Sequence, residues 1–209
     1  GGGSIVASGG GAVVVTGDAD ASSAGADGGQ VISMAAGTQI DGDLGDVTLS
    51  TAGTVTVALV TADAANLNDV SITSLGGSIV DGDVDGSLDV QADELTLSAQ
   101  SGIGDGNALE TSVASFTSVV NAVGGNVALS ELDAATVLTL EQSRSGDIDL
   151  TAGGALTVSS AGTGVRILDG TNLDGADAIT ITADALTVEG PVTVASDNAN
   201  ADVTLTALG

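Results

Sequence analysis

The sequence predicts an all-β protein, a parallel β-helix of about nine coils with roughly 20 to 25 residues in each. Three observations predict this fold. Short segments that alternate apolar with polar residues recur along the whole chain. Gly, Asp, Asn and Ser, which favour turns, separate these segments. Hydrophobic residues make up 43 % of the 209 residues, yet there is one Phe and no Trp or Tyr, so small aliphatic side chains must form the core.

Most of the expected strands are only three or four residues long. Their period of two sends one side of each strand inward and the other to solvent. Separate strands of this length would be marginally stable, whereas in a β-helix each strand pairs with its equivalent one coil above and below. We therefore expect a single continuous solenoid over residues 1–209. The expected strands are 13–15, 31–33, 47–49, 55–57, 70–73, 88–90, 95–97, 127–129, 137–140, 148–150, 156–158, 165–168, 179–182, 186–188, 192–194 and 203–205.

Internal repeats support one coil design used many times. Residues 76–97 and 164–188 both read as an apolar pair, two Asp-Gly or similar turns, an apolar strand, Ala-Asp, and Leu-Thr followed by an apolar residue. Shorter echoes begin with Gly and then Asp or Asn, at residues 45–49, 125–129 and 146–150. We interpret the Gly and Asp residues as corners and the apolar segments as rungs.

Residues 109–123 allow two structures. Leu109, Val113, Phe116, Val120 and Val123 fall at helical spacing, which indicates a short helix outside the coil. The many Thr, Ser and Val residues of the same segment favour a strand. The sequence leaves both open.

The charge of the chain limits its partners. Two Arg stand against 28 acidic residues, for a net charge of -26, so nucleic acids and anionic membranes would be repelled and cations attracted. No apolar run is long enough to cross a membrane.

Because His, Cys, Lys and Tyr are absent, we expect no enzyme, no catalytic residues and no required cofactor. Arg144 and Arg166 are expected to pair with acidic neighbours.

Asp-Gly-Asp occurs twice and suggests a cation site. Alternating carboxylates around a Gly turn can supply oxygen ligands to Ca²⁺, which takes six to eight of them. The calcium candidates are Asp41, Asp43, Asp81, Asp83 and Asp85. The tandem Gly-Gly-x-Gly-x-Asp repeat of calcium-binding β-rolls is absent, so solvated corner residues are the competing interpretation.

The wording of residues 101–131 and 145–158, with its Gly-(Asp/Asn)-(Ile/Val)-x-Leu and GGALTV phrases, resembles repeats of long secreted bacterial proteins of the filamentous-haemagglutinin type. The resemblance implies a right-handed parallel β-helix, a place outside the cell or on its surface, and a role as stalk, adhesin or fibre. It implies no catalytic residues. No secretion-domain motif and no separate receptor-binding module accompany the repeats.

Both termini look like ordinary coils, so we expect either neighbouring repeats in a longer chain or end-to-end self-association. The function expected from these observations is a structural segment of an extracellular or cell-surface fibre or adhesin shaft. A cation- or carbohydrate-binding surface module is the alternative. The same composition allows three weaker hypotheses. They are a polysaccharide-processing β-helix, an ice-binding surface built on Thr-x-Thr phrases, and acidic adaptation to high salt.

Overall fold

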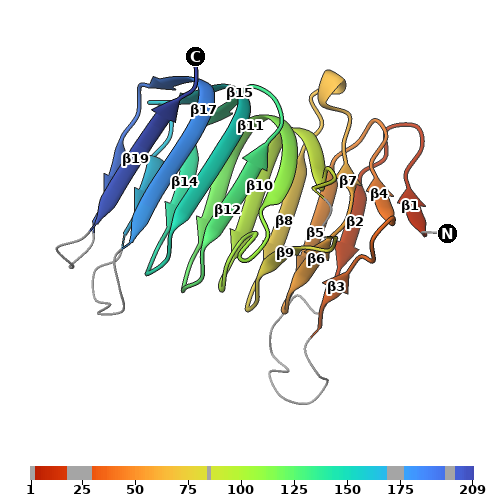
Figure 1. Cartoon of the computed structure of the whole chain (residues 1–209). Coiled ribbons are helices and arrows are strands. Elements are labelled where there is room, and N and C mark those ends of the chain that lie inside the picture. The colour runs from red at the N-terminus through yellow and green to blue at the C-terminus, as the bar shows by residue number, and fades with distance from the viewer. Residues whose placement is uncertain (1–2, 18–29, 84–85, 169–176, 196–200) are drawn as a thin grey trace.

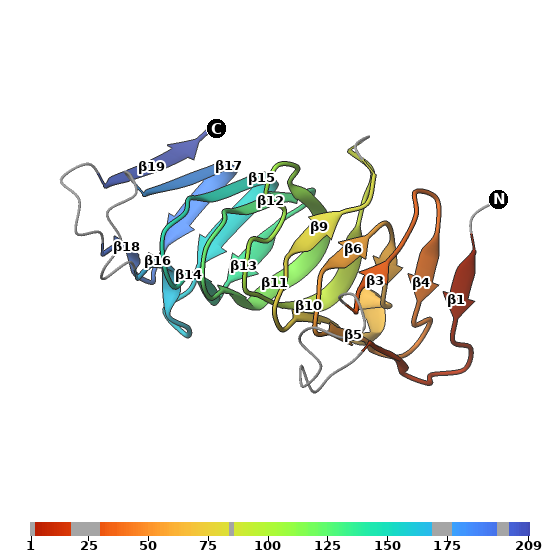
Figure 2. The ribbon, with the colours of Figure 1, turned by 90° about the horizontal axis from the view of Figure 1, so that it is seen from below.

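The computed structural model describes residues 3–17, 30–83, 86–168, 177–195 and 201–209. The chain winds into a β-solenoid of about 7 turns whose strands pair in parallel, as predicted. Its two ends lie at opposite ends of the stack (Figure 1). A view from below shows the turns following one another along one axis (Figure 2). In the described part of the chain, the 3₁₀ turn Ala64–Asn66 interrupts an otherwise all-β structure.

The strands form one large sheet of 16 strands and a smaller one of three, and each turn contributes to several sides of the solenoid. Their bounds are β1 Ser4–Val6, β2 Val13–Thr16, β3 Ile32–Ser33, β4 Gln39–Asp41, β5 Val47–Thr51, β6 Val55–Val57, β7 Val60–Thr61, β8 Val70–Ser74, β9 Ile79–Asp81, β10 Val90–Ala99, β11 Leu109–Asn121, β12 Val127–Glu131, β13 Ala135–Val137, β14 Thr139–Gln142, β15 Ile148–Val158, β16 Gly164–Ile167, β17 Ala178–Val188, β18 Val192–Val194 and β19 Asp202–Ala207.

Aliphatic side chains that occupy the same position in successive turns form columns through the interior. Most of their members are fully buried, and the outermost ones are more exposed. One column consists of Val15, Leu49, Ile72, Leu97, Val119, Leu140, Val165 and Val192. A second consists of Ile32, Val55, Ile79, Ile103, Val127, Ile148, Ile179 and Val203. Each member packs on the residue above and the residue below, so the core is continuous from turn to turn.

Unequal turn length explains why there are about 7 turns and not the predicted nine. Asn126 and Asp147, hydrogen-bonded neighbours in adjacent turns, are 21 residues apart. The separation is 34 residues between Gly9 and Asp43, and 31 between Asp147 and Ala178. These longer turns use more of the chain for each step along the axis.

Residues 109–121 form a strand, which decides between the two structures that the sequence allowed. β11 is 13 residues long, and Phe116 lies within it with no exposed surface. Phe116 pairs with Leu95 on one side and Val137 on the other. Of the five residues at helical spacing, Leu109, Val113 and Phe116 are buried, whereas Val120 is half-buried and Val123 is 50 % exposed. Their spacing resembles that of a helix because the inward residues Val113, Phe116 and Val119 are three apart where the strand passes from one side of the solenoid to the next.

Corner residues link adjacent turns through their side chains. The Asp46 carboxylate accepts a hydrogen bond from the N–H of Asp69 at 3.0 Å, and the Asp69 carboxylate accepts one from the N–H of Glu94 at 3.2 Å. Asn126 accepts from the N–H of Asp147 in the same way, at 2.9 Å. The predicted corner role of Gly-Asp and Gly-Asn therefore has a physical basis, because each side chain satisfies the main chain of the next turn.

The two long copies of the repeated phrase, residues 76–97 and 164–188, place their strands β10 and β17 in the same ladder of the large sheet, but the two copies are offset along it. Ala183 pairs with Ala152, and the same ladder continues through Glu131 and Thr111 to Val90, two residues before the equivalent Ala92. The Asp-Gly turn of the second copy, at residues 169–170, lies outside the described residues. No helix in the described part of the chain is long and apolar enough to span a membrane.

Candidate cation-binding site

The two Asp-Gly-Asp sequences form the same local turn. The first Asp of each is the last residue of a short strand, β4 or β9. In each, the N–H of the second Asp donates to Oδ1 of the first, at 2.8 Å for the pair Asp43 and Asp41 and at 2.8 Å for Asp83 and Asp81. This side-chain-closed turn is typical of Asp before Gly.

The solenoid places the two turns apart. The first follows β4, which pairs with β7 in the large sheet, and the second follows β9, which pairs with β6 in the small sheet. Oδ2 of Asp43 accepts a hydrogen bond from the N–H of Gly9 in the preceding turn at 3.2 Å. Asp41 and Asp43 thus do not join Asp81 and Asp83, and Asp85 lies outside the described residues.

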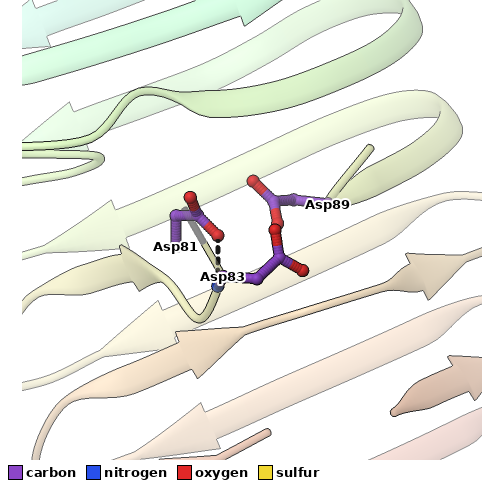
Figure 3. Close-up of side chains that lie close together, drawn as sticks. All are labelled: Asp81, Asp83 and Asp89. Carbon is purple, nitrogen blue, oxygen red and sulfur yellow. Dashed lines mark hydrogen bonds between the residues drawn. The ribbon is translucent and has the colours of Figure 1, made fainter. Parts of the chain in front are cut away.

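Asp81 and Asp83 instead meet Asp89, which sequence reasoning did not select. One carboxylate oxygen from each residue lies within 4.8 Å of the others. Figure 3 shows the Asp89 side chain pointing toward the other two. Asn107, from the next turn, holds the Asp81 turn in place by donating its side-chain N–H to Oδ2 of Asp81 and to the main-chain oxygen of Asp83.

Asp89, the residue before β10, is fully buried although the alternation of that strand, continued by one residue, puts it on the outer side. Strand alternation places it on the same side as Gln91, which is exposed, and opposite to buried Val90. Oδ2 of Asp89 accepts a hydrogen bond from the N–H of Glu110 at 3.0 Å. Oδ1 of Asp89 and Oε2 of Glu110 are buried and accept no hydrogen bond from an N–H or hydroxyl group of the described residues. The two side chains approach closely enough to hydrogen-bond to each other when one of them is protonated.

The electrostatics of the site disfavour so many negative charges together. Burial raises the pKa of Asp89 to about 9, and the nearby charges of Asp81 and Glu110 act in the same direction. Burial also raises the pKa of Glu110, with the charges of Asp81 and Asp83 adding to it. In the folded protein, these carboxyl groups therefore favour taking up a positive charge, either a proton or a metal cation.

A second acidic surface has its oxygens already in use. Asp46, Asp69 and Glu94, with Thr48, Ser71 and Thr96, line a groove of about 250 Å³. The carboxylates of Asp46 and Asp69 accept the main-chain hydrogen bonds between turns described above, and Oε2 of Glu94 accepts from the hydroxyl of Thr117 at 3.0 Å. These residues match the interpretation of acidic corners as structural, solvated positions.

The two arginines were expected to pair with acidic neighbours, and Arg166 does. Its guanidinium donates to Oε2 of Glu141 through Nε at 2.8 Å and through Nη2 at 2.5 Å. The two residues face each other in adjacent strands, β14 and β16.

The residue types at the Asp81, Asp83 and Asp89 cluster narrow its chemistry. Carboxylate oxygens are ligands for hard cations such as Ca²⁺ and Mg²⁺. The sequence signal for Asp89 is that it directly precedes a Val that begins a strand, as do Asp46 and Asp69. That pattern does not reveal which of these three carboxylates is buried.

The chain matches no protein-family model, and comparisons with curated proteins and with solved structures find no similar one.

Proposed function

We propose that this chain is a structural segment of an extracellular or cell-surface fibre or adhesin shaft, and that its work is to provide length and stiffness. The observation that carries the proposal is the continuity of the interior columns and strand ladders through all of the turns. Every turn is bonded to the next on several sides, so bending or stretching the rod requires hydrogen bonds of several strands to break together. At about 4.8 Å for each step, seven steps give roughly 35 Å of rod.

The extracellular location rests on the sequence resemblance of residues 101–131 and 145–158 to filamentous-haemagglutinin-type repeats. Immunogold labelling of intact cells that make the protein tests it. We expect label on the cell surface or in shed fibres. Label that appears only after the cells are permeabilised would contradict this part of the proposal.

The outermost described rungs support a continuing assembly. Ile5 in β1 is 51 % exposed, and Val203 and Leu205 in β19 are 45 % and 43 % exposed, whereas the equivalent residues of middle turns are buried. Unpaired strand edges of this kind are covered when another strand adds to them. We propose that a further β-solenoid coil covers each edge, from neighbouring repeats of the same chain or from another copy.

Removal of one whole turn tests the shaft role. Residues 127–147 contain β12, β13 and β14, which lie between β11 on one side and β15 and β16 on the other. Their deletion removes 21 residues, the local turn length. We expect a folded protein whose rod is shorter by about 4.8 Å, with an unchanged cross-section in small-angle scattering and an unchanged unfolding force in single-molecule pulling.

The matched control deletes half a turn, residues 127–137. It joins Asn126 to Leu138, shifts β14 out of its column and exposes inward side chains, so we expect loss of the fold. If the whole-turn deletion unfolds as readily as the half-turn deletion, the turns are not interchangeable units of length and the proposal fails.

A further inference from the structure

Two buried carboxylate oxygens, one just before β10 and one near the start of β11, accept no hydrogen bond from an N–H or hydroxyl group of the described residues. They are Oδ1 of Asp89 and Oε2 of Glu110. A buried oxygen of this kind is costly unless something supplies positive charge or a hydrogen bond. The guanidinium of Arg166 is held by Glu141, in the later turns of the solenoid. Either a proton shared by the two carboxyl groups or a metal cation can supply the positive charge.

The geometry suits an ion of the size of calcium. Ca²⁺ binds oxygen at 2.3–2.6 Å, so two oxygens on one ion lie at most roughly 5 Å apart. The oxygens of Asp81, Asp83 and Asp89 fall within 4.8 Å of one another. Asp81 and Asp83 are half-buried and Asp89 is fully buried, and the three side chains lie close together (Figure 3).

We propose that Asp81, Asp83 and Asp89 bind one calcium ion. Water completes the six to eight oxygens that Ca²⁺ takes. Mg²⁺ fits less well because it requires near-octahedral geometry, keeps most of its waters and uses one or two carboxylates. The ion replaces repulsion among these carboxylates by attraction, and it ties the turn after β9 to the residue that precedes β10.

Calorimetric titration of the metal-free 209-residue protein with CaCl₂ in 150 mM NaCl tests the proposal, together with melting followed by circular dichroism. We expect one saturable site and a melting temperature that is higher in 2 mM CaCl₂ than in chelator or in 2 mM MgCl₂. Asp89→Asn keeps an oxygen for the N–H of Glu110 but cannot become a carboxylate when the ion binds. We expect it to weaken calcium binding at least tenfold and to abolish the calcium-dependent rise in melting temperature.

The control is Asp41→Asn, in the sister turn, which has the same local geometry but lies outside the cluster. It should bind calcium like the parent protein. Asp83→Asn, at a half-buried position on the solvent side, repeats the test if Asp89→Asn does not fold. Three results would overturn the proposal: no saturable heat, equal responses to calcium and magnesium, or equal loss of binding in the Asp41 and Asp83 variants. The last would indicate diffuse attraction of cations to a chain of charge -26.

Discussion

The side chains of Asn121 and Gln142 lie one above the other at the same corner of adjacent turns, and Nδ2 of Asn121 donates to Oε1 of Gln142 at 2.7 Å. Both residues are fully buried. Asn121 also accepts from the N–H of Gly102 at 3.0 Å and donates to the main-chain oxygens of Gly124 and Gly125, at 2.9 and 3.0 Å. One amide therefore satisfies groups from three successive turns of the solenoid.

Asn121→Ala should destabilise the protein by about 3 kcal/mol or more. The substitution leaves a buried N–H and several buried oxygens without partners, and each such group costs about 1–3 kcal/mol. Urea denaturation followed by circular dichroism measures the change. Asn126→Ala is the matched control, because Asn126 makes its hydrogen bonds to Asp105 and Asp147 near solvent. We expect it to cost less than about 1 kcal/mol. Equal costs for the two variants would refute the buried-amide account.

The stability of the metal-free protein should fall as pH rises above mild acid, in part because of Glu131. Burial raises the pKa of Glu131 above its usual 4.5, although the hydroxyl of Thr111 and nearby main-chain N–H groups oppose the shift. A raised folded-state pKa means that the protonated form is favoured in the folded state. Its stabilisation is complete below pH 4.5, the unfolded value, and is lost as pH rises through the folded pKa.

Melting temperatures between pH 4.5 and 8, measured in chelator, check this prediction for the parent protein and for Glu131→Gln. The melting temperature of Glu131→Gln should depend less on pH than that of the parent protein. The melting temperature of the variant minus that of the parent should therefore increase as pH rises. Glu189→Gln, at an exposed position, should follow the parent curve. A parent protein that becomes more stable from pH 5 to pH 8 would show that the sign is wrong.

Gly146→Ala should cost at least about 2 kcal/mol. Gly146 has a φ of 133°, which L side chains rarely adopt, and an added Cβ would lie 2.2 Å from the main-chain oxygen of Gly125 in the turn below. Gly124→Ala provides the comparison, because its Cβ would meet nothing within 4 Å. Thermal melts of both variants measure the difference. If the two alanines cost the same, turn-to-turn contact at the corner is not what requires glycine.

Strand positions were predictable because the inward side chains repeat with period two and the corners use residues that favour turns. The number of turns was not predictable, because it depends on how many residues each corner contains. No local sequence pattern marks a turn of 31 or 34 residues. The segment around Phe116 illustrates a second limit. Where the strand passes from one side of the solenoid to the next, its inward residues Val113, Phe116 and Val119 are three apart, and together with the outward Val120 and Val123 they imitate a helix.

The site was only partly predictable for a similar reason. Asp81 and Asp83 were recognisable because they flank a Gly turn, and local chemistry alone places them side by side. Asp89 enters the same cluster because the chain returns past the Asp81 turn before it begins β10. Such an approach is a property of tertiary structure, so it leaves no periodic mark on the sequence.

The unequal lengths of the turns have an evolutionary consequence. Insertions that leave the inward columns untouched change only what protrudes at a corner, and neighbouring rungs need no compensating substitution. Natural variants of this chain should therefore differ in length mainly at corners, while the side chains of the columns exchange among Val, Ile and Leu. A scaffold of this kind can acquire new surface loops one at a time without passing through an unfolded ancestor.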